Sequence, residues 1–216
     1  MIKSKDMASQ FVKLPSELTL FNDAQIANEG EYAGLGFADV EIGTREIYDV
    51  RFDDCAFKGG SFGAAAIRGI RLKNVRFTEV DLANCKFDKA SFENVEFIKC
   101  RMTGVKAIEG GMRNVLFKGC QLKLSQFRMS KLKNVRFENC ILEEADFYGA
   151  EIMGAEFTEC DFTKADFSAT KLKDVDLRTS KLVGMSIDVN SLKGVTIDPT
   201  QVNDLAWLLG AKIEWK

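Results

Sequence analysis

One apolar residue recurs at every fifth position through most of this sequence. Between Phe37 and Ile197, 33 positions share this register, and 32 of them hold Leu, Ile, Met or Phe, the exception being Ala107. A second series, two residues earlier, holds small or medium residues, and the positions between the two series are mostly polar or charged. A period of five fits neither the turn of an α-helix nor the alternation of a simple strand. The chain must therefore turn within every repeat.

A longer period of 20 residues is superimposed on the period of five. Segments of the form charged residue, Asn, Val, any residue, Phe begin at Lys73, Glu93, Arg113 and Lys133. If each pentapeptide makes one side of a square, four of them make one coil, and successive coils lie about 4.8 Å apart. Asn would then stack at one corner, where it suits a turn. Phenylalanines would stack as an internal ladder of Phe57, Phe77, Phe97, Phe117, Phe137 and Phe157.

The repeat therefore predicts a single all-β solenoid of about eight coils, because 33 repeats are available and four are used per coil. Each coil buries its apolar residues only against its neighbours, so the ends need caps. The predicted organisation is an N-terminal cap and lead-in over residues 1–34, the repeat region over 35–198, and a C-terminal helix with a short strand over 199–216.

Composition and cysteine positions argue against an enzyme. The sequence has no histidine, which removes the usual general base near neutral pH and a common metal ligand. The cysteines are separated by 30, 15, 20, 20 and 20 residues, unlike the close pairs of metal sites. They occupy the small inward series and are interpreted as buried core residues: Cys55, Cys85, Cys100, Cys120, Cys140 and Cys160. We predict no catalytic residues, no metal and no cofactor.

The N-terminal residues 1–10 are polar and lack the apolar core of a secretory signal. No apolar run approaches the length of a membrane helix. The sequence therefore predicts a cytoplasmic protein that does not associate with a membrane.

The C-terminal segment has the pattern of a short helix. Asp198 is a good N-cap and Pro199 fits the first helical position. Apolar residues follow at helical spacing from Val202, and this face would plug the solenoid. Two interpretations remain open: the helix only plugs the end, or its other apolar residues also join two subunits. The predicted dimer interface comprises Leu205, Trp207, Leu208, Leu209 and Trp215.

The repeat resembles that of the pentapeptide-repeat family, in which a small and a polar residue precede a central Leu or Phe and two polar residues follow. Two segments that fit closely are Ala145-Asp146-Phe147-Tyr148-Gly149 and Ala165-Asp166-Phe167-Ser168-Ala169. The resemblance covers about three quarters of the chain. It implies a right-handed quadrilateral parallel β-helix.

The ends resemble those of the Qnr-type (quinolone-resistance) members of this family, of the Gram-positive kind. The matching segments are Leu14-Pro15-Ser16-Glu17-Leu18 and the stretch from Asp198 to Ile213. The resemblance implies a homodimer through the C-terminal helix, DNA gyrase or topoisomerase IV as a partner, and an effect on fluoroquinolone sensitivity. The unbroken register leaves no room for the projecting loops that many Gram-negative Qnr proteins use in protection.

Charge is uneven along the chain, although the net charge is only −2. Residues 101–140 carry a net charge of +7 and residues 141–180 carry −6. An acidic surface that would imitate DNA in part is predicted at Glu143, Asp146, Glu156, Asp161 and Asp166. A basic face is predicted at Arg71, Lys73, Arg113, Lys131, Lys133, Lys171 and Lys173.

Three functional hypotheses follow from these surfaces. The chain could bind a type II topoisomerase as a partial DNA mimic, dock an acidic partner or nucleic acid on the basic face, or act as a general protein-interaction scaffold. Few aromatic residues are expected on the outside, so base stacking is not supported. Direct DNA binding is therefore not favoured by the sequence.

Overall fold

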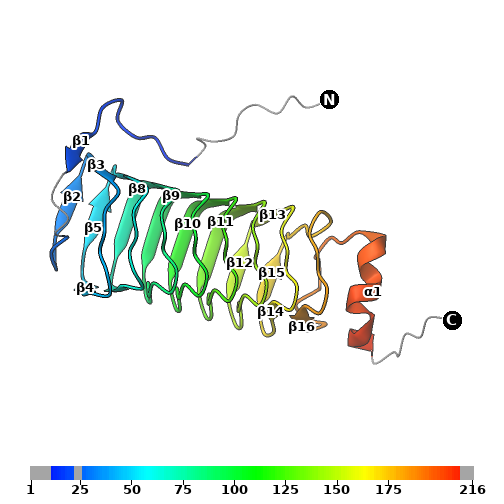
Figure 1. Ribbon diagram of the computed structural model, residues 1–216. Coiled ribbons are helices and arrows are strands. Elements are labelled where there is room, and N and C mark those ends of the chain that lie inside the picture. The colour runs from blue at the N-terminus through cyan, green and yellow to red at the C-terminus, as the bar shows by residue number, and fades with distance from the viewer. Residues whose placement is uncertain (1–10, 22–25, 210–216) are drawn as a thin grey trace.

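The computed structural model describes residues 11–21 and 26–209 and shows a parallel β-solenoid (Figure 1). From Glu31 onward, strands of successive coils pair in parallel with an offset of 20 residues, as where Met112 lies opposite Leu132; the first pair, Thr19 with Leu35, is offset by 16. The predicted solenoid of about eight coils is confirmed. The offset explains why the pattern repeats every 20 residues, since residues 20 apart occupy equivalent places in neighbouring coils.

Four eight-residue strands form the middle of the main sheet: β8 (Arg71–Thr78), β9 (Ser91–Ile98), β10 (Gly111–Lys118) and β11 (Lys131–Glu138). Shorter strands extend this sheet at both ends: β1 (Thr19–Phe21), β2 (Glu31–Ala33), β3 (Leu35–Ala38), β5 (Arg51–Asp53), β6 (Ala56–Lys58), β12 (Glu151–Met153), β13 (Glu156–Thr158) and β15 (Lys171–Lys173). Two small sheets pair β4 (Glu46–Tyr48) with β7 (Ala66–Arg68) and β14 (Asp166–Phe167) with β16 (Ser186–Ile187). Because β2 already pairs with β5 at the 20-residue offset, coil stacking begins within the segment predicted as lead-in.

Each eight-residue strand turns a corner at an asparagine, as the repeat predicted. The four asparagines have φ between 52° and 55°, a left-handed conformation that Asn tolerates better than most residues. Their side chains form a ladder in which each Nδ2 donates to the Oδ1 of the preceding coil at 2.6–3.0 Å. The ladder consists of Asn74, Asn94, Asn114 and Asn134.

The corner divides the main sheet into two sides of the rod. We call one side the basic face; it is formed by β5, β12, β15 and the first three residues of β8 to β11. The adjacent side is called the arm face; it is formed by β6, β13 and the last four residues of β8 to β11. Outward residues of one face stand in rows, one per coil.

The core is built from stacked aromatic rings and small residues. The rings from Phe37 to Phe157 stack at centroid distances of 4.4–5.2 Å, one ring per coil. A second, shorter stack joins Phe127, Phe147 and Phe167 at 4.7–5.0 Å. The predicted phenylalanine ladder is thus confirmed.

All six cysteines are buried and free, as predicted for core residues. The thiol of Cys120 donates to the carbonyl oxygen of Phe97 at 3.2 Å, and Cys140 bonds Phe117 in the same way at 3.3 Å. Burial raises the pKa of Cys85 to about 12, so little of this thiol is ionised at neutral pH.

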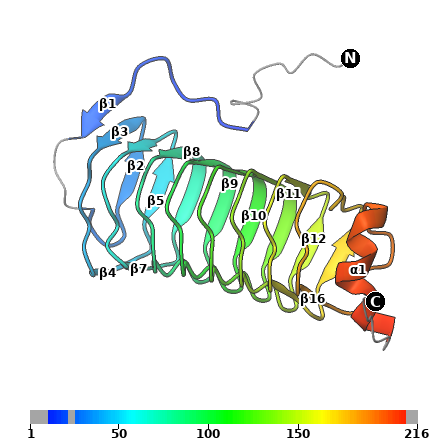
Figure 2. The ribbon, with the colours of Figure 1, turned by 45° about the vertical axis from the view of Figure 1, so that its right-hand side comes forward.

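An N-terminal arm, residues 11–18, runs back along the arm face (Figures 1 and 2). Val12 is only 1% exposed, and its N–H donates to Oε1 of Glu96 at 3.4 Å. The other oxygen of Glu96 accepts from Nε of Arg76 at 2.8 Å, and the Glu96 side chain is fully buried. The guanidinium of Arg136 lies 5.2 Å from the centre of the Phe11 ring. The sequence pattern does not predict this packing of the arm on the arm face.

The C-terminal end is capped by three short helical segments: η1 (Pro199–Gln201), α1 (Val202–Leu205) and η2 (Ala206–Leu209). Asp198 is the N-cap and Pro199 follows it, as predicted. Gln201 donates from Nε2 to the carbonyl oxygens of Leu177 and Ser180 at 2.7 and 2.5 Å, which satisfies backbone groups of the last coil. Val202 is 51% exposed, so its assignment to the plug face was wrong. No helix in the described part of the chain is long and apolar enough to cross a membrane.

Candidate interaction surfaces

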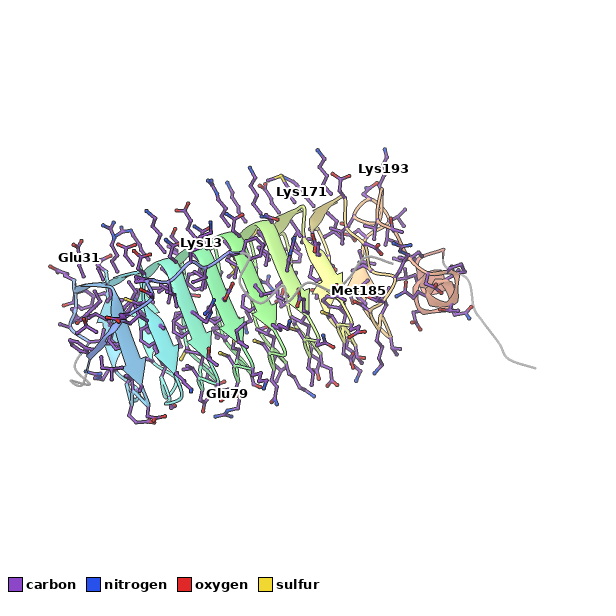
Figure 3. All side chains as sticks on the ribbon, turned by 90° about the horizontal axis from the view of Figure 1, so that it is seen from above. Lys13, Glu31, Glu79, Lys171, Met185 and Lys193 are labelled. Carbon is purple, nitrogen blue, oxygen red and sulfur yellow. The ribbon has the colours of Figure 1, made fainter. Side chains whose placement is uncertain are left out.

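The structure brings all seven residues of the predicted basic face to one side of the rod. They lie in the outward rows of β8, β10, β11 and β15, where Arg113 faces Lys133 across the β10–β11 pair. Lys193 lies one 20-residue period after Lys173, in a turn that makes no strand pair with β15. Figure 3 shows Lys171 and Lys193 extending from one long side of the rod, while Glu79 extends from the opposite side.

Most cations of the basic face lack an acidic partner. Lys171 is paired, since its Nζ lies 2.9 Å from Oε1 of Glu151. The hydrogen bond and charge of Lys171 lower the pKa of the Glu151 carboxyl. The other six predicted cations form no ion pair with any residue that the structure describes: Arg71, Lys73, Arg113, Lys131, Lys133 and Lys173. This side of the rod therefore carries uncompensated positive charge.

The five carboxylates of the predicted acidic surface do not form one surface. Glu156 belongs to β13 on the arm face, whereas Asp161 and Asp166 lie in two further rows of β-bridges. Four of the five are also ion-paired, at 2.7–3.2 Å: Glu143 with Lys123, Asp146 with Arg128, Glu156 with Arg136, and Asp161 with Lys181. Residues of opposite sign about 20 apart in sequence become neighbours, and their charges largely cancel. The carboxylates were predicted on two neighbouring faces, whereas they lie on three sides of the rod; their role in binding a partner stays a prediction.

The predicted dimer residues divide between cap and surface. Leu205 is 6% exposed and belongs to the hydrophobic core, so its side chain seals the solenoid and is not available to a second subunit. Leu208 is partly buried and packs against the same core. The side chains of Trp207 and Leu209, and all of Trp215, lie outside the described residues.

Two features missed from the sequence have a recognisable signal. Ile98 and Leu116 are apolar at outward positions of the arm face, where other coils carry charged or polar residues, and Leu116 is 2% exposed. Such outward apolar residues indicate that another segment covers that face.

Gln201 is the third residue after the N-cap Asp198, which is the spacing of a capping box.

The described surface shows open, shallow hollows. One lies on the basic face, where the small residues Ser91 and Gly111 leave space beside Arg113, Lys131 and Lys133. Among the residues that the structure describes, no group of three or more His, Cys, Asp or Glu side chains could hold a metal ion.

These observations define a class: a parallel β-solenoid with a five-residue repeat, whose flat sheet faces and short end cap form its surface. The sequence profile of the pentapeptide repeat region matches residues 45–127, 90–161 and 130–207. Together the overlapping matches cover well over half of the chain, and the chain belongs to the pentapeptide repeat family.

Solved structures with a similar fold include other pentapeptide repeat proteins. A trypsin-treated variant of QnrB1, a plasmid-mediated fluoroquinolone resistance protein, is 19% identical over 92% of this chain and 100% of its own, with a TM-score of 0.37. HetL, involved in heterocyst differentiation regulation in the cyanobacterium Nostoc sp., is 14% identical over 78% of this chain and 89% of its own, with a TM-score of 0.35. Neither likeness carries an argument about function. A comparison with curated proteins finds no match.

Proposed function

We propose that this chain is a non-enzymatic interaction protein whose solenoid faces bind a macromolecular partner. The supporting observation is the form of the described surface, in which charged side chains stand in straight rows on flat faces. A catalytic site usually needs a concave pocket in which a few polar groups converge. The hollows described here are open instead, and the charged groups around them are spread along the rows.

We propose a type II topoisomerase, DNA gyrase or topoisomerase IV, as the partner. The support is the resemblance of both chain ends to those of Qnr-type proteins, together with the cap that begins at Asp198 and Pro199. The ion pairs around Glu143, Asp146 and Asp161 weaken the idea that these carboxylates imitate DNA. Mimicry of DNA is therefore a partial contribution at most, and the proposal rests on the ends of the rod.

A gyrase supercoiling assay with and without a fluoroquinolone tests this partner. Excess protein should either inhibit supercoiling or restore it in the presence of the drug, because occupation of the DNA-binding groove competes with DNA. An equal mass of serum albumin controls for non-specific protein effects. The topoisomerase proposal fails if neither activity nor drug sensitivity changes for gyrase and for topoisomerase IV.

We also propose that the C-terminal end joins two copies of the chain. Light scattering should then give about twice the 24.1 kDa chain mass, and Leu208→Asp should halve it, because a buried charge at an apolar contact is costly. Val183→Asp is the matched control, since Val183 is 46% exposed on a coil outside the cap and should leave the dimer intact. A monomeric unsubstituted protein would refute this arrangement.

A second candidate function is supported by a separate observation, the unpaired cations of the basic face. A general scaffold for protein binding would not require a row of charges of one sign. Docking of an acidic partner would require such a row of positive charges.

A further inference from the structure

We infer that the basic face binds the phosphate backbone of duplex DNA without reading its sequence. The inference does not depend on the topoisomerase proposal. It rests on the basic face, whereas the topoisomerase proposal rests on the two ends of the chain. It also revises the prediction from sequence that direct DNA binding is not favoured. The sequence did not show which cations of the basic face form ion pairs and which do not.

The geometry is a straight row of exposed cations. Lys73, Arg113, Lys133 and Lys173 occupy the same outward place in β8, β10, β11 and β15, and strand pairing keeps them in register. Lys193 lies in a turn beyond the last strand of this sheet and makes no strand pair with β15. Five coil steps separate Lys73 from Lys173, and at about 4.8 Å per step the row is about 24 Å long. This length is about two thirds of one turn of B-DNA, which is about 34 Å.

A second, shorter line runs parallel to this row. Arg71 and Lys131 lie two residues before Lys73 and Lys133, about 7 Å away across one inward residue. All of these side chains are exposed, and none forms an ion pair within the described residues. The result is a narrow strip of six cations along the rod axis that form no ion pair within the described residues.

A linear polyanion fits this strip better than an acidic protein does. Protein interfaces draw most of their affinity from buried aromatic and apolar anchors. Such an anchor would have to be a large apolar side chain that is exposed on the basic face. Among the described residues of this face, Met153 has that character, with 45% of its surface exposed. Binding to a phosphate backbone needs only repeated positive charge, and it releases counterions from the duplex.

Other residues interrupt the cations: Met153 is uncharged in the row, Glu151 in the second line is paired with Lys171, and Glu93 is negatively charged. Glu93 stands in the row between Lys73 and Arg113, is exposed, and has no ion-pair partner in the described part of the chain. A phosphate that approaches Arg113 would be repelled by this carboxylate. Removing the charge should therefore strengthen DNA binding.

The test is fluorescence anisotropy with a duplex of about 30 base pairs, in two unrelated sequences, between about 50 and 200 mM salt. Both sequences should bind alike, and log affinity should fall with log salt at a slope of about −4.5 to −5.4, as expected for five or six phosphate contacts. Arg113→Glu/Lys133→Glu should weaken binding at least tenfold and reduce the slope by about 2. Glu93→Gln should tighten binding by roughly twofold or more.

The matched control is Lys58→Glu/Lys86→Glu, which changes net charge equally through two exposed lysines on other sides of the rod. It should change DNA affinity much less than the Arg113→Glu/Lys133→Glu variant, and circular dichroism melting should show both variants folded. The inference is overturned by absence of binding at low salt, by equal losses in both variants, or by poly-glutamate displacing DNA as well as DNA itself does. It is also overturned if vesicles with phosphatidylserine bind to the same residues more tightly than DNA, because the partner would then be a lipid surface.

Discussion

Replacing Phe117 with alanine should lower the free energy of unfolding by about 3–5 kcal/mol. The Phe117 ring is fully buried and stacks on the rings of Phe97 and Phe137 at 5.0 and 4.8 Å. Its loss removes two stacked contacts and leaves a cavity that the rigid coils cannot close. The effect should be large because each coil is stabilised only by its neighbours.

Urea denaturation followed by circular dichroism measures this change. Met129→Ala is the control, because Met129 is 52% exposed at a corner and should alter stability by about 0.5 kcal/mol or less. Similar losses in the two variants would show that the phenylalanine stack is not the main source of stability.

Replacing Arg76 with alanine should destabilise the protein by about 3 kcal/mol. The substitution leaves the carboxylate of Glu96 buried beneath the N-terminal arm, with the N–H of Val12 as its remaining hydrogen-bond partner among the described residues. A buried charge that loses its partner costs more than the pair itself contributes. Thermal or urea unfolding of the variant measures the loss.

The double variant Arg76→Met/Glu96→Leu separates the charge effect from lost packing. It removes both charges and keeps apolar volume, so it should be more stable than Arg76→Ala alone. If the double variant is as unstable as the single one, the cost arises from packing and the role assigned to the buried carboxylate is incorrect. The Lys118→Ala substitution, at a half-buried ion pair with Glu138 that lacks a fully buried charge, should cost no more than about 1 kcal/mol.

Much of the fold could be predicted from the sequence because a solenoid converts spacing along the chain into position in space. The asparagines at Asn94 and Asn114 were expected at a corner, and they lie there with left-handed backbone and a shared hydrogen bond. The cysteines were expected in the core because they occupy the same small inward series as Ala and Val. In both cases the position of the residue within the five-residue repeat determines the direction of its side chain.

The interaction surfaces could be predicted only in part. All seven residues predicted for the basic face lie on one side of the rod, because each flanks an inward residue of that side, and their role in binding stays a prediction. The pairing of charges was not predictable in the same way. Lys181 is paired with Asp161, whereas Lys133 forms no ion pair with a carboxylate of the described residues, and this difference depends on which residues the next coil places nearby and on side-chain conformation.

The sequence by itself determined the solenoid, its inward residues and its corners, because every stabilising contact of that kind joins residues that share one register. The tertiary structure decided what covers the faces and closes the ends. The arm joins Val12 to Glu96 and the cap joins Gln201 to Leu177, and no repeat links these positions. The arm and the cap lie outside the repeat, and each binds at one particular site on a repetitive surface. The spacing of the repeat does not specify that site, so only the folded chain shows where it is.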